Sequence, residues 1–69
     1  MSTQSVVFNS KDYDEKKCKL WLKNHNLVPI KKVHIVGDQL RYRILKPQFK
    51  HYFTKILQDD RVHLIIGYD

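Results

Sequence analysis

Short runs of β-branched and aromatic residues are separated by polar segments along the chain. Residues 5–9 read SVVFN, and residues 62–68 read VHLIIGY. Between them, residues 33–44 change from apolar to polar at almost every step on both sides of a Gly-Asp pair. Period-two patterns of this composition are typical of β-strands. The sequence therefore predicts a first strand at 5–9, a hairpin over 33–44 and a last strand at 62–68.

The hairpin predicts where two arginines point. Gly37 and Asp38 supply a two-residue turn with glycine first, which favours type II′ geometry. On the return strand, Arg41 and Arg43 occupy the positions between apolar residues, and neighbouring side chains project to opposite faces. The apolar residues are Leu40, Tyr42 and Ile44. We expect these to face a helix, and both arginines to lie on the other face with His34.

A helix is predicted from about residue 13 to residue 25. Asp12 and Glu15 have the spacing of a capping box, and Asn26 stands where a left-handed residue closes a helix. Pro29 prevents the helix from continuing. Apolar residues recur at i, i+3, i+4 and i+7, namely Cys18, Trp21, Leu22 and His25. This face of the helix is expected to cover the sheet.

Residues 47–57 fit two structures. A helical stripe runs through Phe49, Tyr52, Phe53 and Ile56, with Pro47 at its start, but the residues are poor helix formers. The favoured interpretation is one helical turn at 47–51 followed by two strands. The fold class is then α+β: a small antiparallel sheet of four or five strands with one main helix, in the order β-α-β-β-(short helix)-β-β. The alternative is a ferredoxin-like βαββαβ order.

Size and composition indicate one small binding domain. The 69 residues form a single domain, 1–69, in which residues 1–4 are expected to fray and no deep pocket is expected. A lone cysteine, Cys18, is typical of a reducing compartment. No signal pattern and no apolar run of ~20 residues occurs, so an intracellular protein is expected, neither secreted nor in a membrane.

Catalytic and metal-binding patterns are absent from the sequence. The four histidines and Cys18 have no zinc-ligand spacing, and no glycine-rich phosphate loop or nucleophile motif occurs. We therefore expect no enzymatic activity, no metal and no cofactor.

A net charge of +6, with pI near 9.6, favours a polyanionic partner. Lysine and arginine side chains that gather on one face can neutralise phosphates. The candidate nucleic-acid-binding residues are Arg41, Arg43, Lys31, Lys32, Lys46 and Lys50. The alternative is a face that is merely solvated, as one face of an antiparallel sheet commonly is.

The chain resembles a small domain that recurs in proteins of large DNA viruses and tailed phages. The similarity lies in Trp21-Leu22 with a helix-closing His25, in residues 41–43 (Arg-Tyr-Arg), in Pro47 with Phe49, and in residues 65–67 (Ile-Ile-Gly). Asn26 departs from the glycine that this family tends to have. The resemblance implies a viral source and a second hairpin over 52–68. It implies no particular activity and no further site residues.

Two functions follow as hypotheses. The first is a basic, non-enzymatic protein that binds the phosphate backbone of DNA or RNA. The second is a protein-interaction or virion-structural module whose partner is a second copy or another viral or host protein. Self-association is expected to use the last strand if it lies at a sheet edge, since LIIGY carries no charge to block pairing.

Overall fold

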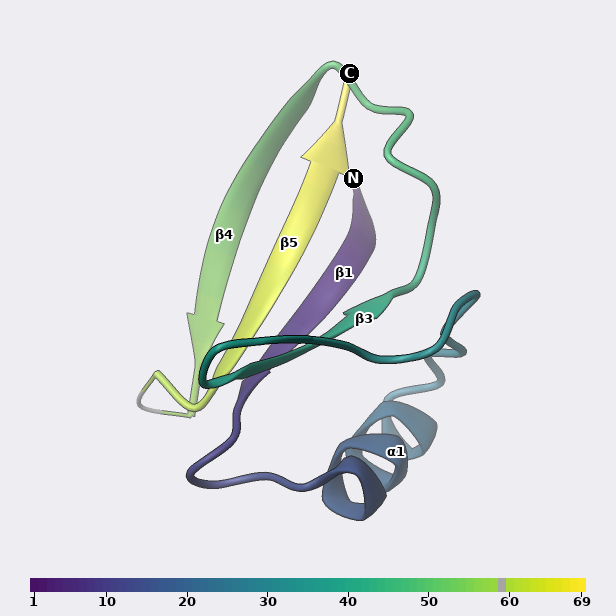
Figure 1. Cartoon of the computed structure of the whole chain (residues 1–69). Coiled ribbons are helices and arrows are strands. Elements are labelled where there is room, and N and C mark those ends of the chain that lie inside the picture. The colour runs from purple at the N-terminus through teal and green to yellow at the C-terminus, as the bar shows by residue number, and fades with distance from the viewer. Residues whose placement is uncertain (59) are drawn as a thin grey trace.

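The computed structural model describes residues 1–58 and 60–69, and it contains one helix and one five-stranded antiparallel sheet (Figure 1). This arrangement confirms the predicted α+β class. In chain order the elements are β1 (Ser2–Asn9), α1 (Glu15–Asn24), β2 (His34–Val36), β3 (Gln39–Arg43), β4 (His51–Leu57) and β5 (Val62–Tyr68). The first strand begins at Ser2, so residues 2–4 belong to the sheet and are not a frayed end.

The strands are arranged in the order β2-β3-β1-β5-β4, and every neighbouring pair is antiparallel. The first strand lies at the centre, paired with β3 on one side and with β5 on the other. The last strand is therefore an inner strand, and the suggestion that it lies at an edge is wrong. The two edges are β2, which has three residues, and β4, which has seven.

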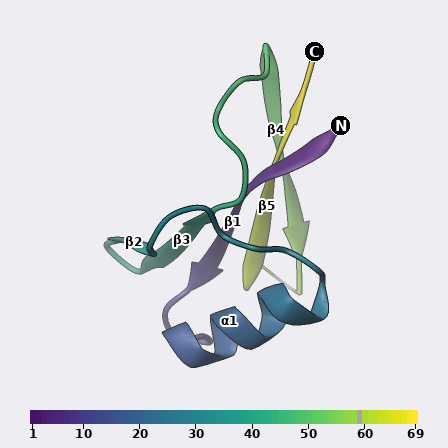
Figure 2. The ribbon, with the colours of Figure 1, turned by 90° about the vertical axis from the view of Figure 1, so that its right-hand side faces the viewer.

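An aromatic cluster around Phe8 forms the core between α1 and the sheet. Phe8 is fully buried and its ring lies 5.0 Å from that of Tyr13, 5.5 Å from Trp21 and 5.8 Å from Tyr42. The helix crosses one face at the lower end of the sheet, and the upper parts of β4 and β5 extend beyond it (Figure 2). The helix therefore covers only part of that face.

The helix begins two residues later than the capping box predicted. Its N-cap is Asp14, whose carboxylate accepts a hydrogen bond from the Lys17 amide at 2.8 Å. Asp12 is not the cap because the amides of Asp12 and Tyr13 both donate to the Asn9 carbonyl, which forms a turn before the helix. The predicted end is confirmed, since Asn26 has a φ of 57° and the next amide returns to the Leu22 carbonyl.

The hairpin of β4 and β5 confirms the second-hairpin interpretation and excludes the βαββαβ order. The helical turn predicted at 47–51 is wrong: 47–50 have no helical structure, and His51 starts β4. A long-range contact explains the difference, because the Phe49 ring occupies the space above Gly67. A Cβ atom placed on Gly67 would clash with the Phe49 ring. Glycine at this position lets Phe49 pack on the sheet.

Candidate nucleic-acid interface

The two arginines of β3 lie on the sheet face away from α1, as the alternation predicted. Tyr42, between them, is 2% exposed and packs on Phe8 in the core, so its neighbours must project to the opposite face. Arg41 is directly paired with Val7 of β1 and with His34 of β2. Paired residues share a face, which places His34 beside Arg41 in one row across the strands. We call this side of the sheet the outer face.

A groove of about 370 Å³ lies on the outer face, between β1, β3 and the loop that follows the helix. We call it the basic groove. Its lining residues are Gln4, Ser5, Lys31, Lys32, His34, Arg41 and Arg43. Four carry a fixed positive charge, His34 gains one when protonated, and none of the described lining residues is acidic.

One hydrogen bond brings the two lysines to this groove. The Ile30 amide donates to the Arg43 carbonyl at 2.9 Å, which attaches the loop to the end of β3. Lys31 and Lys32 follow directly, and both are exposed. Because β2 pairs with β3 only as far as Arg41, the loop lies where β2 does not reach. Lys31 and Lys32, which belong to no strand, therefore line the same groove as the two arginines.

A bulge in β1 forms the floor of the groove. The register with β5 shifts between Thr3 and Ser5, which leaves Gln4 as the extra residue. Its carbonyl accepts hydrogen bonds from the amides of Ile44 and Leu45, at 2.8 and 3.1 Å, and its side-chain amide donates to the Leu45 carbonyl at 3.0 Å. These bonds fix the chain where it leaves β3. The bulge therefore gives the floor a rigid, polar shape.

Two of the six predicted residues lie outside the groove. Lys46 is in the connection after β3 and does not line it. Lys50 precedes β4, and its amide donates to the Asp69 carboxylate at 3.3 Å, beside an acidic group. The groove instead adds Gln4 and Ser5. No local pattern indicated these two, because their role depends on a bulge and on contacts with a segment 41 residues away in sequence.

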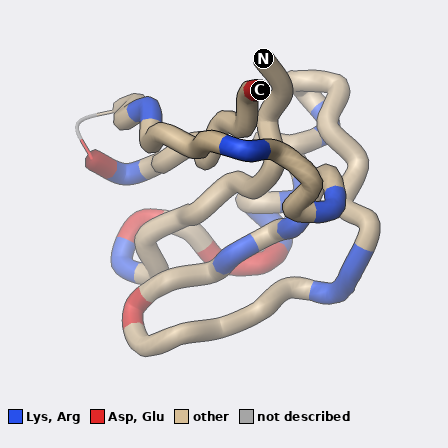
Figure 3. The backbone as a smooth tube through the Cα atoms, turned by 90° about the horizontal axis from the view of Figure 1, so that it is seen from above, with Lys and Arg blue, Asp and Glu red and all other residues tan. Residues whose placement is uncertain are grey.

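The groove cations lack carboxylate partners within the described chain. The ion pairs found among the described residues lie elsewhere: Arg61 with Asp12, and His63 with Asp60 when His63 is protonated. In Figure 3 the right-hand end of the tube carries basic segments without acidic ones among the described residues. Four positive charges held on one surface repel one another, and a bound anion would relieve this repulsion.

The chain's single thiol is part of the core. Cys18 is buried, and desolvation raises the pKa of its thiol to about 11, so the thiol stays protonated and unreactive at neutral pH. Within residues 1–58 and 60–69, no three His, Cys, Asp or Glu side chains gather where they could hold a metal ion. None of the described helices is long and apolar enough to cross a membrane.

Comparisons with protein-family models, with curated proteins and with solved structures give no match to this chain. Its function is therefore inferred from the charges and contacts of the basic groove and from the surfaces around it.

Proposed function

We propose that this protein binds the phosphate backbone of a nucleic acid in the basic groove. The observation that carries the proposal is the groove lining itself, in which four cationic side chains stand without a described acidic neighbour. Arg41 and Arg43 present planar guanidinium groups that bind phosphate oxygens in pairs, and Lys31 and Lys32 add mobile ammonium groups along one wall. Ser5 also lines the groove, where its hydroxyl donates to the Gln4 side-chain oxygen at 2.7 Å.

The arrangement favours backbone binding over sequence recognition. Tyr42, the aromatic residue of the arginine strand, is buried and offers no surface for base stacking. The exposed aromatic ring on the outer face belongs to Tyr52, on the edge strand three strands away from β3. Contacts to phosphate carry no direct sequence information. We therefore expect similar affinity for oligonucleotides of unrelated sequence.

Salt dependence measures how many groove cations contact phosphate. If all four bind, log K plotted against log salt concentration for duplex DNA has a slope of about −3.6, that is ~0.9 per neutralised phosphate. Fluorescence anisotropy of a labelled 15-base-pair duplex, titrated at several salt concentrations, gives this slope. A second duplex of unrelated sequence is the control and should give the same line. Absence of binding at low salt, or affinity that does not respond to salt, contradicts the proposal.

A second function, self-association, is favoured by the edge strand β4. From His51 to Ile56 every residue of this strand is exposed, and Tyr52, Phe53 and Ile56 are 41%, 40% and 58% exposed. Lys55 is the one lysine, arginine, aspartate or glutamate of this strand, and the strand contains no proline or described bulge. Natural edge strands normally carry charges, prolines or bulges that block pairing with another strand. We propose that β4 pairs with β4 of a second copy.

The residues of β4 select one pairing register. An antiparallel pair centred on Thr54 places Thr54 opposite its own copy, Phe53 opposite Lys55, and Tyr52 opposite Ile56. Threonine pairs and aromatic–aliphatic pairs are favourable across strands, and Lys55 lies beside an aromatic ring. The register shifted by one residue on each strand would place Lys55 opposite Lys55, which is repulsive. The Thr54-centred register also places the outer faces of the two copies on the same side of the combined sheet.

A cysteine at the two-fold position tests this register. In a Thr54→Cys variant the two introduced residues would be ~4.5–5.5 Å apart between Cα atoms, within the range of a disulfide. Mild oxidation at a protein concentration that favours the dimer should give a covalent dimer on non-reducing gels. Cys18 does not interfere, because it is buried and protonated.

An Ile56→Cys variant is the matched control for this experiment. In the proposed register the two cysteines introduced at position 56 lie ~13 Å apart along the paired strands and should not cross-link. Equal cross-linking of both variants would indicate random collision. A wild-type chain that sediments as a monomer at millimolar concentration would contradict pairing through β4.

A further inference from the structure

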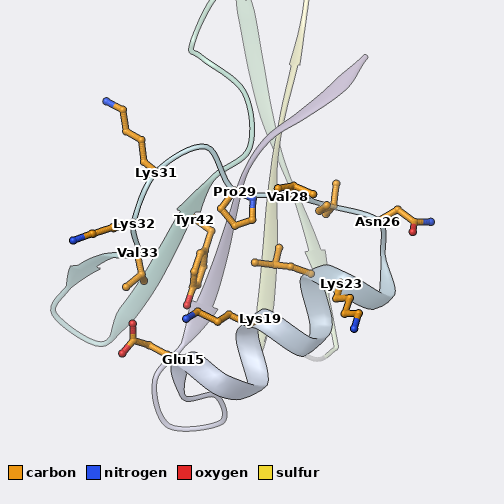
Figure 4. Close-up of a pocket in the computed structure, with 12 residues that line it drawn as sticks. Glu15, Lys19, Lys23, Asn26, Val28, Pro29, Lys31, Lys32, Val33 and Tyr42 are labelled. Atoms are coloured by element: carbon orange, nitrogen blue, oxygen red, sulfur yellow. The ribbon is translucent and has the colours of Figure 1, made fainter.

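A second hollow lies on the opposite side of the sheet from the basic groove. It is a cleft of about 850 Å³ between α1 and the loop that follows the helix, and it opens to solvent (Figure 4). We call it the helix–loop cleft. Its lining residues are Glu15, Lys19, Leu22, Lys23, Asn26, Leu27, Val28, Pro29, Lys31, Lys32, Val33 and Tyr42.

The cleft exists because the loop is held at both ends and arches away from the helix between them. At one end the Leu27 amide donates to the Leu22 carbonyl at 2.9 Å, and at the other the Ile30 amide donates to the Arg43 carbonyl. Pro29, between these two bonds, cannot donate a hydrogen bond of its own. The cleft is therefore fixed by the backbone and does not require a ligand to hold it open.

The interior of the cleft is apolar. Leu22 and Tyr42 are 1% and 2% exposed, and Leu27 and Val33 are partly buried against the same core. Val28, in contrast, is 78% exposed at the mouth. The apolar surface that is open to water therefore comes from Leu27, Val28, Pro29 and Val33, and a ligand with a hydrocarbon or aromatic body would cover it.

One corner of the cleft is polar. The Tyr42 hydroxyl is buried without a hydrogen-bond partner in the described chain, and the neighbouring Cys18 thiol is only a weak acceptor. With less than 1 Å² of its oxygen exposed, this hydroxyl belongs to the core beneath the cleft and is out of reach of a ligand in it. Figure 4 shows the Lys19 side chain projecting from α1 on the helix side of the cleft. The ammonium groups of Lys19 and Lys23 suit an acidic head group.

The net charge of the cleft lining also favours an anionic ligand. Four lysines line the cleft, at 19, 23, 31 and 32, against one described acid, Glu15. In Figure 4 Lys31 and Lys32 extend outward from the loop, so Lys19 and Lys23 of the helix are the cations that belong to this cleft alone. Glu15 also lines the cleft and repels an anion, so removing its charge should increase the affinity for an anionic ligand.

We propose that the helix–loop cleft binds a small amphipathic anion, an acyl or aromatic carboxylate. Its apolar body lies on Leu27, Val28 and Val33, and its carboxylate accepts hydrogen bonds from the ammonium groups of Lys19 and Lys23. This proposal does not depend on nucleic-acid binding, because Lys19 and Lys23 line this cleft and not the basic groove, although Lys31 and Lys32 line both hollows.

Decanoate is a suitable probe for this cleft. Titration of the ¹⁵N-labelled protein, followed by amide and methyl shifts, should show saturable changes at residues of the cleft and not at those of β4. Butyrate has the same head group with little tail, and decyltrimethylammonium has the same tail with the opposite charge. Both should bind at least about tenfold more weakly than decanoate. Equal binding of decyltrimethylammonium, or shifts spread over the exposed half of the sheet, would overturn the proposal.

Variants on the helix provide the matched control. Lys19→Glu with Lys23→Glu should weaken decanoate binding about tenfold or more, whereas Lys16→Glu with Lys17→Glu, an equal change outside the cleft, should leave it unchanged. Glu15→Gln should strengthen decanoate binding, because it removes the negative charge from the cleft lining. None of these residues lines the basic groove, so oligonucleotide affinity reports separately on the proposed nucleic-acid function. Indifference of decanoate binding to Lys19→Glu with Lys23→Glu would overturn the assignment.

Discussion

Reversing two charges in the basic groove, with Arg41→Glu and Arg43→Glu in one variant, is expected to weaken nucleic-acid binding by at least about 100-fold. Each arginine contributes a charge-assisted contact worth on the order of 1.5–3 kcal/mol, and each glutamate adds repulsion toward phosphate. Two such losses exceed the ~2.7 kcal/mol that correspond to a hundredfold change in affinity. Fluorescence anisotropy with the same labelled duplex at low salt measures the difference.

The matched control changes the same amount of charge elsewhere. Lys46→Glu with Lys50→Glu also lowers the net charge by four, but neither residue lines the groove. If the groove is the binding surface, this control loses only the long-range part of the attraction, less than about tenfold near physiological salt, where charges beyond ~8 Å are largely screened. Equal losses in both variants would show that net charge alone accounts for binding.

The arginine variant should fold normally. Arg41 is exposed and Arg43 is half-buried on the outer face, and neither has an acidic partner in the described chain. Surface substitutions of this kind usually change stability by about 0.5 kcal/mol or less. An unchanged far-UV circular dichroism spectrum and melting temperature therefore separate a loss of binding from a loss of structure. Collapse of the fold would show that the arginines are structural.

Local rules account for the parts of the fold that were predicted correctly. A two-residue turn at Gly37-Asp38 fixes the register of the hairpin, and Gly37 has the positive φ, 55°, that such a turn requires. From that register and the alternation, the outward direction of Arg41 follows without further information. Asn26 closes the helix for an equally local reason, since asparagine tolerates the left-handed region better than other non-glycine residues.

Contacts between distant segments account for what the sequence did not predict. The inner position of β5 depends on its pairing with β1, at the other end of the chain. The absence of the predicted helical turn at 47–51 is explained by Phe49, which packs over Gly67. The same holds for the groove: Lys31 and Lys32 join it through the bond between Ile30 and Arg43, and no spacing rule distinguishes them from the lysines at 46 and 50.

Replacing Phe8 with alanine is expected to unfold the protein. Phe8 is fully buried, and it contacts three aromatic rings from the helix, the preceding turn and β3. Phe→Ala substitutions in cores cost about 3–5 kcal/mol, which is comparable to the whole stability of a domain of this size. Urea denaturation followed by circular dichroism should show a cooperative transition for the wild type and none for the variant. Leu20→Ala, at a residue that is 59% exposed and lies outside both hollows and β4, is the control and should lose at most about 1 kcal/mol. A cooperative transition retained by Phe8→Ala would contradict the central role of this residue.

The Phe8→Ala variant also separates charge from geometry. It keeps the formal net charge of +6 but loses the sheet and the loop attachment that hold the four groove cations together. If oligonucleotide affinity requires the basic groove, it should fall with the fold, even though the same lysines and arginines are present. An unfolded chain that binds as tightly as the wild type, with the same salt slope, would show that the cations act as an unstructured polycation and not through the groove.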